Sequence, residues 1–288
     1  MAILDPRLHA YREDLANIDL QEKVSAERYV AGSPARIGSH FADILKSPDS
    51  SSMLQTQILY GHDVTVFDQR DGWAWIQNSF DGYVGYVQEQ VLVPLDSQAQ
   101  PAPTHMVLAP RTFLYRAPDL KLGRVGYRSM GSKLCVADRI STRGTDYAIL
   151  QSGEAVISNH LIEIGNWKSD PLSVAETLIH TPYLWGGSTG FGVDCSGLVA
   201  LSYMLCGQQV LRDSDMQAAS IGSEIPMDFD RLQRGDLVFW NGHVGMMADG
   251  KNLLHANGNT MDVAYEPLAK AIERIGYLYQ QPTMVRRP

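Results

Sequence analysis

Residues 183–205 read YLWGGSTGFGVDCSGLVALSYML. A glycine-rich loop leads here into a run whose apolar residues recur at helical spacing, which predicts a helix beginning at Cys195. The free N–H groups and the dipole at a helix start lower the pKa of a thiol and can bind an oxyanion. Cys195 is therefore a candidate nucleophile, expected to be partly exposed. The alternative is a small buried hydrophobic residue, the usual environment of a free cysteine.

Three strand-like runs follow this helix, at 236–240, 243–247 and 252–256. One helix followed by an antiparallel sheet is an α+β arrangement. A hairpin between the last two runs would bring His243 and His255 together. A nucleophilic cysteine needs a base within hydrogen-bond reach and a third group that orients the base. His243 suits the first role and His255 the second, although two structural histidines or a zinc site with Cys195 would share this pattern.

Short β-like runs separated by turn residues occupy residues 55–93, which favours a small barrel. A linker rich in proline and alanine follows at 95–103. Similar runs then return about 70 residues later, as in a tandem duplication of one barrel. Both segments resemble bacterial SH3-like modules. Residues 11–24 favour an amphipathic helix before the first of them.

The composition excludes several classes of protein. The chain has 288 residues, 44% of them hydrophobic, and a formal net charge of -8. This length suits two or three folded domains, and the acidic balance argues against nucleic acid or an anionic membrane as the main partner. No apolar run is long enough to span a bilayer. The first residues lack a secretory pattern and there are three cysteines, so we expect a cytoplasmic protein.

Five motifs in the C-terminal part, taken together, resemble the NlpC-type cysteine peptidases of bacteria. They are PYLWGG at 182–187, DCSG at 194–197, RGDLVFW at 234–240, HVGM at 243–246 and HA at 255–256. The resemblance implies a circularly permuted papain-like fold. It also implies Cys195 as nucleophile, His243 as base and His255 as the third member of the triad. Tyr183 would lie beside the nucleophile and assist the oxyanion, and Trp185 would form a wall of the substrate pocket.

Two SH3-like modules before such a domain are similar to the γ-D-glutamyl-L-diamino acid endopeptidases of murein peptide recycling. This resemblance implies a substrate with a free N-terminal amine, such as L-Ala-γ-D-Glu-meso-diaminopimelate. It assigns the amine and the glutamate to three residues of the catalytic domain, Asp194, Ser196 and Ser214, and to Tyr83 of the first module. The acidic residue that usually follows Tyr/Phe-Gly in that module is replaced here by His62, so that Asp63 is the candidate for its role.

We therefore expect a multidomain chain with two all-β SH3-like barrels followed by an α+β permuted papain-like catalytic domain. The expected boundaries are an N-terminal extension at 1–45, barrels at 46–98 and 104–164, and a peptidase domain at 166–288. The expected activity is that of a cysteine endopeptidase without cofactor or metal. The alternatives are an acyltransferase or general cell-wall amidase on the same fold, and a cell-wall binding protein anchored by its SH3-like modules.

Overall fold

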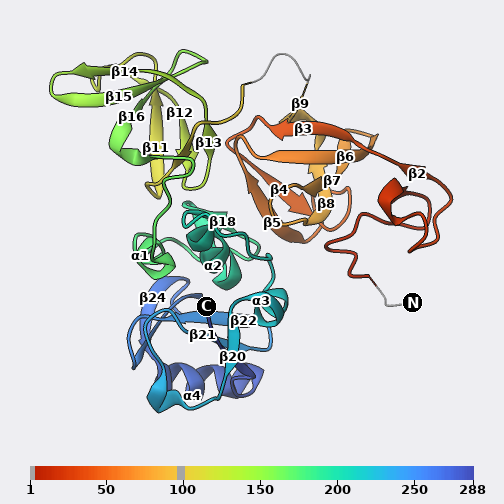
Figure 1. The fold of residues 1–288 in the computed structure, drawn as a ribbon, viewed down its shortest axis with the longest axis vertical. Coiled ribbons are helices and arrows are strands. Elements are labelled where there is room, and N and C mark those ends of the chain that lie inside the picture. The colour runs from red at the N-terminus through yellow and green to blue at the C-terminus, as the bar shows by residue number, and fades with distance from the viewer. Residues whose placement is uncertain (1–3, 96–100) are drawn as a thin grey trace. The chain divides into compact units, whose positions relative to one another are not determined.

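The computed structural model describes residues 4–95 and 101–288, apart from the side chains of residues 278 and 279. Two compact units make up the chain, one of residues 1–107 and 112–161, the other of residues 108–111 and 162–288 (Figure 1). This division falls a few residues before the start at 166 that we expected for the catalytic domain. The central part of the expected linker, residues 96–100, lies outside the described residues.

The N-terminal segment does not form the helix expected over residues 11–24. Residues 4–32 contain three short elements, β1 (Ala16–Asn17), a 3-10 helix (Ile18–Leu20) and β2 (Tyr29–Val30). Its apolar residues instead pack individually, since Ala10 and Leu15 join a buried cluster with Trp75 of the first module. Above this cluster, the Arg12 guanidinium lies 4.4 Å from the centroid of the Trp75 ring. Helical spacing of apolar residues gives a short segment little stability as an isolated helix. The contacts with the first module therefore determine its conformation.

The first module is a seven-stranded antiparallel sheet in the order β5-β4-β8-β7-β6-β3-β9. The strands are β3 (Ser33–Ile37), β4 (Phe41–Leu45), β5 (Leu54–Leu59), β6 (Asp63–Arg70), β7 (Trp73–Asn78), β8 (Val84–Gln88) and β9 (Leu92–Pro94). Three of the expected runs are strands β6, β7 and β8. The expected boundary at residue 46 falls inside this sheet, because β4 pairs with β5 along its whole length.

The second module consists of strands and one short 3-10 helix across residues 104–164, all of which are described. Its sheets have the orders β12-β11-β16-β15-β14 and β13-β10-β17. The strands are β10 (His105–Val107), β11 (Arg111–Tyr115), β12 (Arg124–Ser129), β13 (Lys133–Leu134), β14 (Val136–Thr142), β15 (Thr145–Leu150), β16 (Ala155–Ile157) and β17 (Leu161–Glu163). Residues 104–164, where we expected the second barrel, therefore form β-structure.

The β6–β7 and β14–β15 hairpins share two irregular features at equivalent positions. Each has a register shift in its first strand, between Val66 and Asp68 in one and between Val136 and Asp138 in the other. Each also turns through a non-glycine residue and a glycine that both have positive φ, Asp71–Gly72 and Arg143–Gly144. A bulge and a turn of this kind set the twist and the register of a hairpin. Their recurrence agrees with the duplication that the sequence pattern predicts.

The two β-modules meet at the segment Tyr60–Gly61–His62. The buried His62 ring contacts the Gly131 carbonyl oxygen through Nε2 at 2.9 Å. The amide of Lys133 donates to the Tyr60 carbonyl at 2.9 Å, and a Cβ on Gly61 would overlap the carbonyl of Lys133. The residue that replaces the expected acid is thus an interior residue that joins the modules.

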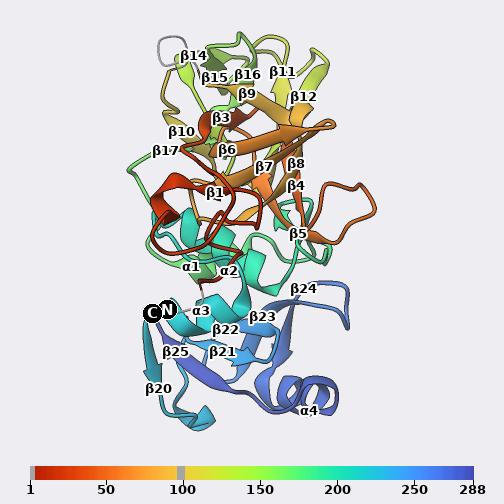
Figure 2. The ribbon, with the colours of Figure 1, turned by 90° about the vertical axis from the view of Figure 1, so that its right-hand side faces the viewer.

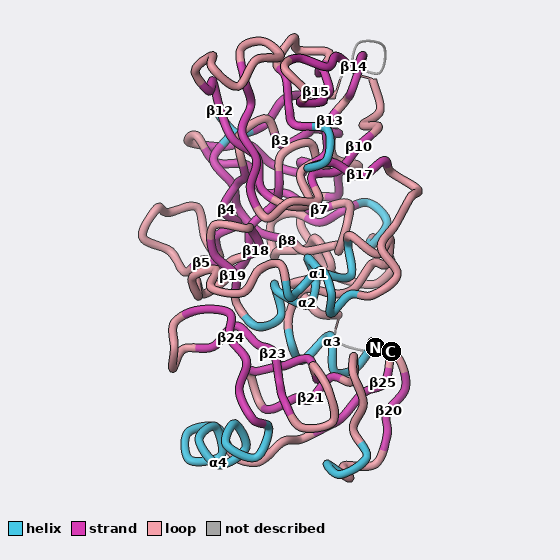
Figure 3. Tube along the Cα trace, turned by 90° about the vertical axis from the view of Figure 1, so that its left-hand side faces the viewer, coloured by secondary structure: helices cyan, strands magenta, loops and turns pink. Residues whose placement is uncertain are grey.

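The second unit is built on a six-stranded sheet in the order β20-β25-β21-β22-β23-β24. The strands are β20 (Ser223–Ile225), β21 (Leu237–Trp240), β22 (His243–Met247), β23 (Asn252–Asn257), β24 (Asp262–Pro267) and β25 (Met284–Arg287). Its helices are α1 (Pro171–Glu176), α2 (Cys195–Met204), α3 (Ser214–Ser220) and α4 (Leu268–Tyr279). In Figure 2 and Figure 3, α4 covers one face of the sheet and α1, α2 and α3 lie on the other. This is the expected α+β layout.

Candidate active site

Cys195 is the first residue of α2, as the sequence predicts. The cap residue before it, Asp194, accepts a 2.7 Å hydrogen bond from the Gly197 amide. The thiol is 7% exposed and therefore buried, not partly exposed as expected. The reason is that α2 packs against β22 and β23, where the backbone N–H of Val244 is directed at the sulfur. This contact puts the thiol next to the residue that follows His243.

Glycines allow the loop before Cys195 to approach the helix closely. The loop folds back as the short hairpin β18 (Ser188–Thr189) and β19 (Gly192–Val193). A Cβ on Gly197 would overlap the carbonyl oxygen of Gly187, and one on Gly187 would lie 2.6 Å from the Gly192 oxygen. The glycines of the GG and DCSG motifs are therefore required by backbone contacts that set the position of the helix start.

A buried ion pair fixes the residues around the thiol. Arg212 donates to both oxygens of Asp194, through Nη1 at 3.0 Å and Nη2 at 2.8 Å, and to Ser196 Oγ at 2.8 Å. Asp194 also accepts from the amides of Gly197 and Gly186 at 2.7 and 2.9 Å. A carboxylate offers about four lone-pair sites, so these contacts saturate Asp194. Arg212, which we did not single out in the sequence, is the central residue of this network.

Burial is the main influence on the thiol's acidity. It raises the pKa of Cys195 to about 12, and the nearby Asp194 carboxylate acts in the same direction. The N–H groups of Val244 and Ser196 and the charge of Arg212 oppose this increase without cancelling it. The helix start alone therefore does not yield a thiolate. The thiol needs a base that takes its proton and then stabilises the sulfur anion as a neighbouring cation.

The hairpin of β21 and β22 turns through Asn241–Gly242, with Trp240 opposite His243. On the other side, β22 pairs with β23, and the two imidazoles meet as the sequence predicts. Nε2 of His243 lies 2.9 Å from Nδ1 of His255, with ring centroids 5.1 Å apart. Burial, followed by the electrostatic influence of His255 and then of Arg274, lowers the pKa of His243 to about 3. His243 is therefore neutral at pH 7 and is able to accept a proton.

Glu266 on β24 extends this pair, and sequence reasoning did not find it. Its Oε2 lies 3.2 Å from Nε2 of the fully buried His255, although this contact does not meet the geometric criteria of a hydrogen bond. Arg274 of α4 holds the same carboxylate through two hydrogen bonds of 3.0 and 2.6 Å. Contacts with His255 and then Arg274 lower the pKa of Glu266 to about 2. Glu266 belongs to no motif, and only the strand register reveals it.

The remaining candidate residues of the catalytic unit lie on neighbouring segments. Tyr183 is half-buried, and its amide donates to the Met261 carbonyl at 2.8 Å. Trp185 is 61% exposed and is therefore not a core residue. Ser214 is the first residue of α3 and is half-buried. Ser196 is buried and bonded to Arg212.

The two candidate residues of the first module are engaged within it. Asp63 accepts a 2.7 Å hydrogen bond from Nε of Arg36, so its carboxylate already has a cationic partner. Tyr83 is buried, and its hydroxyl lies 3.5 Å from Gln55 Oε1. Neither observation assigns a substrate contact to these residues.

Among the described residues, no group of three or more histidine, cysteine, aspartate or glutamate side chains is placed to hold a metal ion. The same described residues include no helix with the length and apolar character needed to cross a bilayer.

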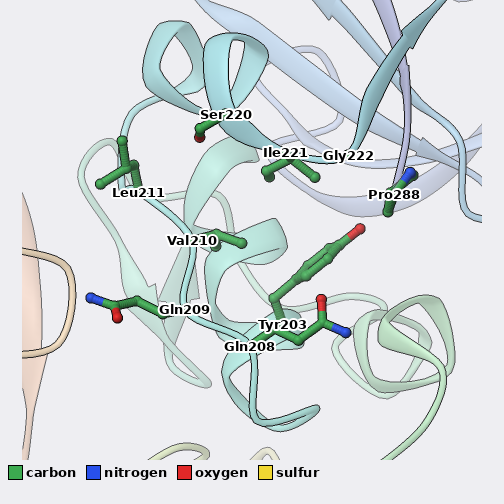
Figure 4. A pocket seen from close by; sticks show the side chains of 9 residues that line it. All are labelled: Tyr203, Gln208, Gln209, Val210, Leu211, Ser220, Ile221, Gly222 and Pro288. Atoms are coloured by element: carbon green, nitrogen blue, oxygen red, sulfur yellow. The ribbon is translucent and has the colours of Figure 1, made fainter.

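A separate pocket of about 320 Å³ lies at the C-terminal end of α2 (Figure 4). It is lined by Tyr203, by Gln208 to Leu211, by Ser220 to Gly222 and by Pro288. Tyr203 follows Cys195 by eight residues on the helix, a rise of about 12 Å. The pocket is thus distinct from the thiol site, and its lining contains no charged side chain.

Two families match the chain. The NlpC/P60 family matches residues 180–278, and the bacterial dipeptidyl-peptidase SH3 domain matches residues 44–92. Among relatives, dipeptidyl-peptidase 6 of Lysinibacillus sphaericus is 27% identical over 269 residues, which are 83% of this chain and 97% of the relative. A γ-D-glutamyl-L-lysine dipeptidyl-peptidase of Bacillus cereus is 26% identical over 242 residues, covering 76% of this chain and 72% of the relative.

A solved structure has the same fold. The crystal structure of an NlpC/P60 family protein from Bacillus cereus superposes with a TM-score of 0.73 and 23% identity. The alignment covers 88% of this chain and 99% of that one. With these matches, the chain is shown to carry a bacterial SH3 domain followed by an NlpC/P60 domain, the domain family of the cysteine peptidases that its motifs resemble.

Proposed function

We propose that the chain is a cysteine endopeptidase that cleaves the bond between γ-D-glutamate and a diamino acid in murein peptides with a free N-terminal L-Ala. One observation carries the proposal most directly. The Cys195 thiol lies at a helix start against the strand that begins with His243, and His243 is hydrogen-bonded to His255. The name of the Bacillus cereus relative, a γ-D-glutamyl-L-lysine dipeptidyl-peptidase, supports this class of substrate.

In the proposed mechanism, His243 takes the proton of Cys195, and the thiolate attacks the γ-carbonyl of D-glutamate. The backbone N–H at the start of α2 and the Tyr183 hydroxyl stabilise the oxyanion. The imidazolium then gives its proton to the departing amine of the diamino acid, which leaves a thioester on Cys195. Water, deprotonated by His243, hydrolyses this thioester and releases L-Ala-D-Glu.

The contacts of Asp194 refine the proposed recognition of the substrate amine. Its oxygens are occupied by Arg212 and two backbone amides, so we assign it to positioning Cys195 and Ser196 rather than to direct binding of the ammonium. Ser214 and Tyr83 remain the proposed contacts. An ammonium in a closed pocket needs several acceptors, because burying an uncompensated charge is costly.

Digestion of L-Ala-γ-D-Glu-meso-diaminopimelate, followed by mass analysis, tests the proposal. The expected products are L-Ala-D-Glu and free diaminopimelate, and Cys195→Ala should abolish them while the fold is retained. The N-acetylated peptide should react about ten- to hundred-fold more slowly, because it lacks the ammonium and loses one charge-assisted hydrogen bond. Equal cleavage of the acetylated peptide or of intact murein would identify a general cell-wall amidase instead. Transfer of the acyl group to an added amine without hydrolysis would identify an acyltransferase.

Tyr83→Phe tests the proposed contribution of the first module. It should lower kcat/KM for the free peptide by less than N-acetylation of the substrate does, because one neutral hydrogen bond contributes about 1 kcal/mol. The N-acetylated peptide should show no difference between the variant and the natural chain. A loss of the same size for both peptides would assign Tyr83 to folding of the module.

A further inference from the structure

Glu266 reaches the histidine pair because of the register between β23 and β24. In this ladder His255 lies opposite Ala264, and Leu253 lies opposite Glu266. Ala264 and Glu266 are two residues apart and so project from the same face of the sheet, which makes Glu266 a diagonal neighbour of His255. The 3.2 Å approach of Glu266 Oε2 to His255 Nε2 follows from this geometry.

The 2.9 Å contact between His243 Nε2 and His255 Nδ1 requires one proton between the two nitrogens. If His255 Nδ1 carried it, the neutral His255 would have a bare Nε2, whose lone pair would face the Glu266 carboxylate. That arrangement is repulsive. If His243 Nε2 carries the proton, it donates a hydrogen bond to His255 Nδ1. His255 then has its own proton on Nε2 and can donate it in a hydrogen bond to Glu266. An ionised Glu266 therefore favours the second arrangement, which leaves Nδ1 of His243 as the basic nitrogen.

We propose that Glu266, fixed by Arg274, is a positioning residue that sets the proton arrangement of the His243–His255 pair and so presents Nδ1 of His243 as the base. This inference rests on the proposed pairing of Cys195 with His243. It adds a fourth group to the three that the sequence motifs indicate. Glu266 acts through His255 and needs no contact with the substrate.

Two features separate this role from a purely structural one. Arg274 donates to Oε1 through Nε and to Oε2 through Nη2, and the same Oε2 lies 3.2 Å from His255 Nε2, so the carboxylate contacts both residues at once. Among the other bidentate pairs of the same unit is Arg234 with Glu176, which involves no histidine. If the Glu266–Arg274 pair only held α4 on the sheet, removing it would affect the histidine pair no more than removing the Arg234–Glu176 pair.

The test compares Arg274→Met with the double variant Glu266→Met/Arg274→Met. The single variant keeps the carboxylate beside His255. The double variant replaces the ion pair with apolar side chains of similar length, which leaves no unpaired charge and is compatible with folding. Glu176→Gln is the matched control for the loss of an ion pair elsewhere in the unit. Two readouts need no substrate: imidazole nitrogen shifts, which report the protonated nitrogen, and the rate at which iodoacetamide alkylates Cys195 at pH 7.

In the natural chain, in Arg274→Met and in Glu176→Gln, the His243 proton should reside on Nε2. In the double variant a large fraction should move to Nδ1, and alkylation should slow about ten- to hundred-fold, as expected for the loss of a hydrogen bond to a charged group. In peptide cleavage kcat should fall by a similar factor with KM unchanged. Glu266→Gln, which keeps one acceptor oxygen and loses the charge, should give an intermediate loss in alkylation rate.

An unchanged Nε2 proton and an alkylation rate within about twofold of the natural chain, in both the double variant and Glu266→Gln, would overturn the inference. Failure of the proposed function has a different signature. In that case the natural chain would not cleave the murein peptide, while the nitrogen shifts and the alkylation rates would still separate the variants.

Discussion

The thiol side and the imidazole side of the site each contain a bidentate arginine–carboxylate pair, and the two pairs differ in burial. Arg212 and Asp194 have side chains that are 2% and 12% exposed, whereas Arg274 and Glu266 are 26% and 19% exposed. Removing one member of a fully buried pair leaves an uncompensated charge without water, which is costly. A pair in partial contact with water tolerates change. An arginine–carboxylate pair can therefore stabilise the fold on the thiol side of the site and influence proton transfer by His243 on the imidazole side.

The neighbours of each carboxylate point to the same difference. Asp194 receives its hydrogen bonds from Arg212 and from backbone amides of the loop that positions Cys195. Glu266 instead has a titratable partner, His255, on one side and Arg274 on the other. We infer that variants on the thiol side act mainly on stability, and that variants on the imidazole side act mainly on proton transfer.

The largest effect is expected for Arg212→Met, which leaves Asp194 buried and unpaired. The free energy of unfolding should fall by about 3–5 kcal/mol in urea denaturation. In the double variant Asp194→Asn/Arg212→Met the stranded charge is absent and the helix cap is kept, so part of the loss should be recovered. A cost below about 1 kcal/mol for the single variant would place this pair in the same class as surface pairs.

The next effect concerns acid stability. The pKa of the Glu266 carboxyl is lowered from 4.5 to about 2, so the folded chain binds fewer protons there than the unfolded chain between these values. The corresponding stability is complete above the unfolded pKa and is lost as the pH falls through the folded one. The free energy of unfolding of the natural chain should therefore decrease between about pH 5 and pH 2. In Glu266→Gln this decrease should be smaller by about 2 kcal/mol. Parallel pH profiles for the two proteins would contradict this assignment.

Arg274→Met should have a smaller effect on stability and a distinct effect on His243. The charge of Arg274 is one of the influences that lower the pKa of His243, while that of Glu266 raises it. The variant should therefore raise the pKa of His243 in an NMR titration and reduce stability by only about 0.5 kcal/mol. Glu266→Gln should shift the same pKa in the opposite direction. Shifts of equal sign in both variants would show that repacking, not charge, dominates.

The smallest effect is expected at the exposed pair of Arg234 and Glu176. Arg234 is 44% exposed and keeps Asp170 as a second partner, so Glu176→Gln should change stability by less than about 0.5 kcal/mol. The alkylation rate of Cys195 should stay within about twofold of the natural chain. A larger change in either measurement would mean that ion pairs anywhere in this unit influence the site, which would weaken the contrast between its two sides.

Local pattern was sufficient for much of the fold. Hairpin β6–β7 was expected from short β-like runs and turn residues, and similar runs were expected about 70 residues later; the structure adds a bulge and a positive-φ turn that β6–β7 and β14–β15 share. The start of α2 at Cys195 was expected from the glycine-rich loop and the helical run. The pattern failed over residues 11–24, where contacts with the first module replace the expected helix. It also placed the first module's boundary at 46, although the sequence has turn residues on both sides of β4, Gly38–Ser39 before it and SPDSSS at 47–52 after it.

The sequence by itself determined which chemistry the chain carries: a cysteine at a helix start and two histidines on successive strands, within motifs that span a few residues each. Such information is local, because helix caps, turns and strand alternation depend on near neighbours. Only the tertiary structure decided how these groups are tuned. The burial of Cys195, the saturation of Asp194 by Arg212 and the approach of Glu266 to His255 all join residues that are distant in sequence. They depend on strand register and packing, which place side chains together without leaving a local signal.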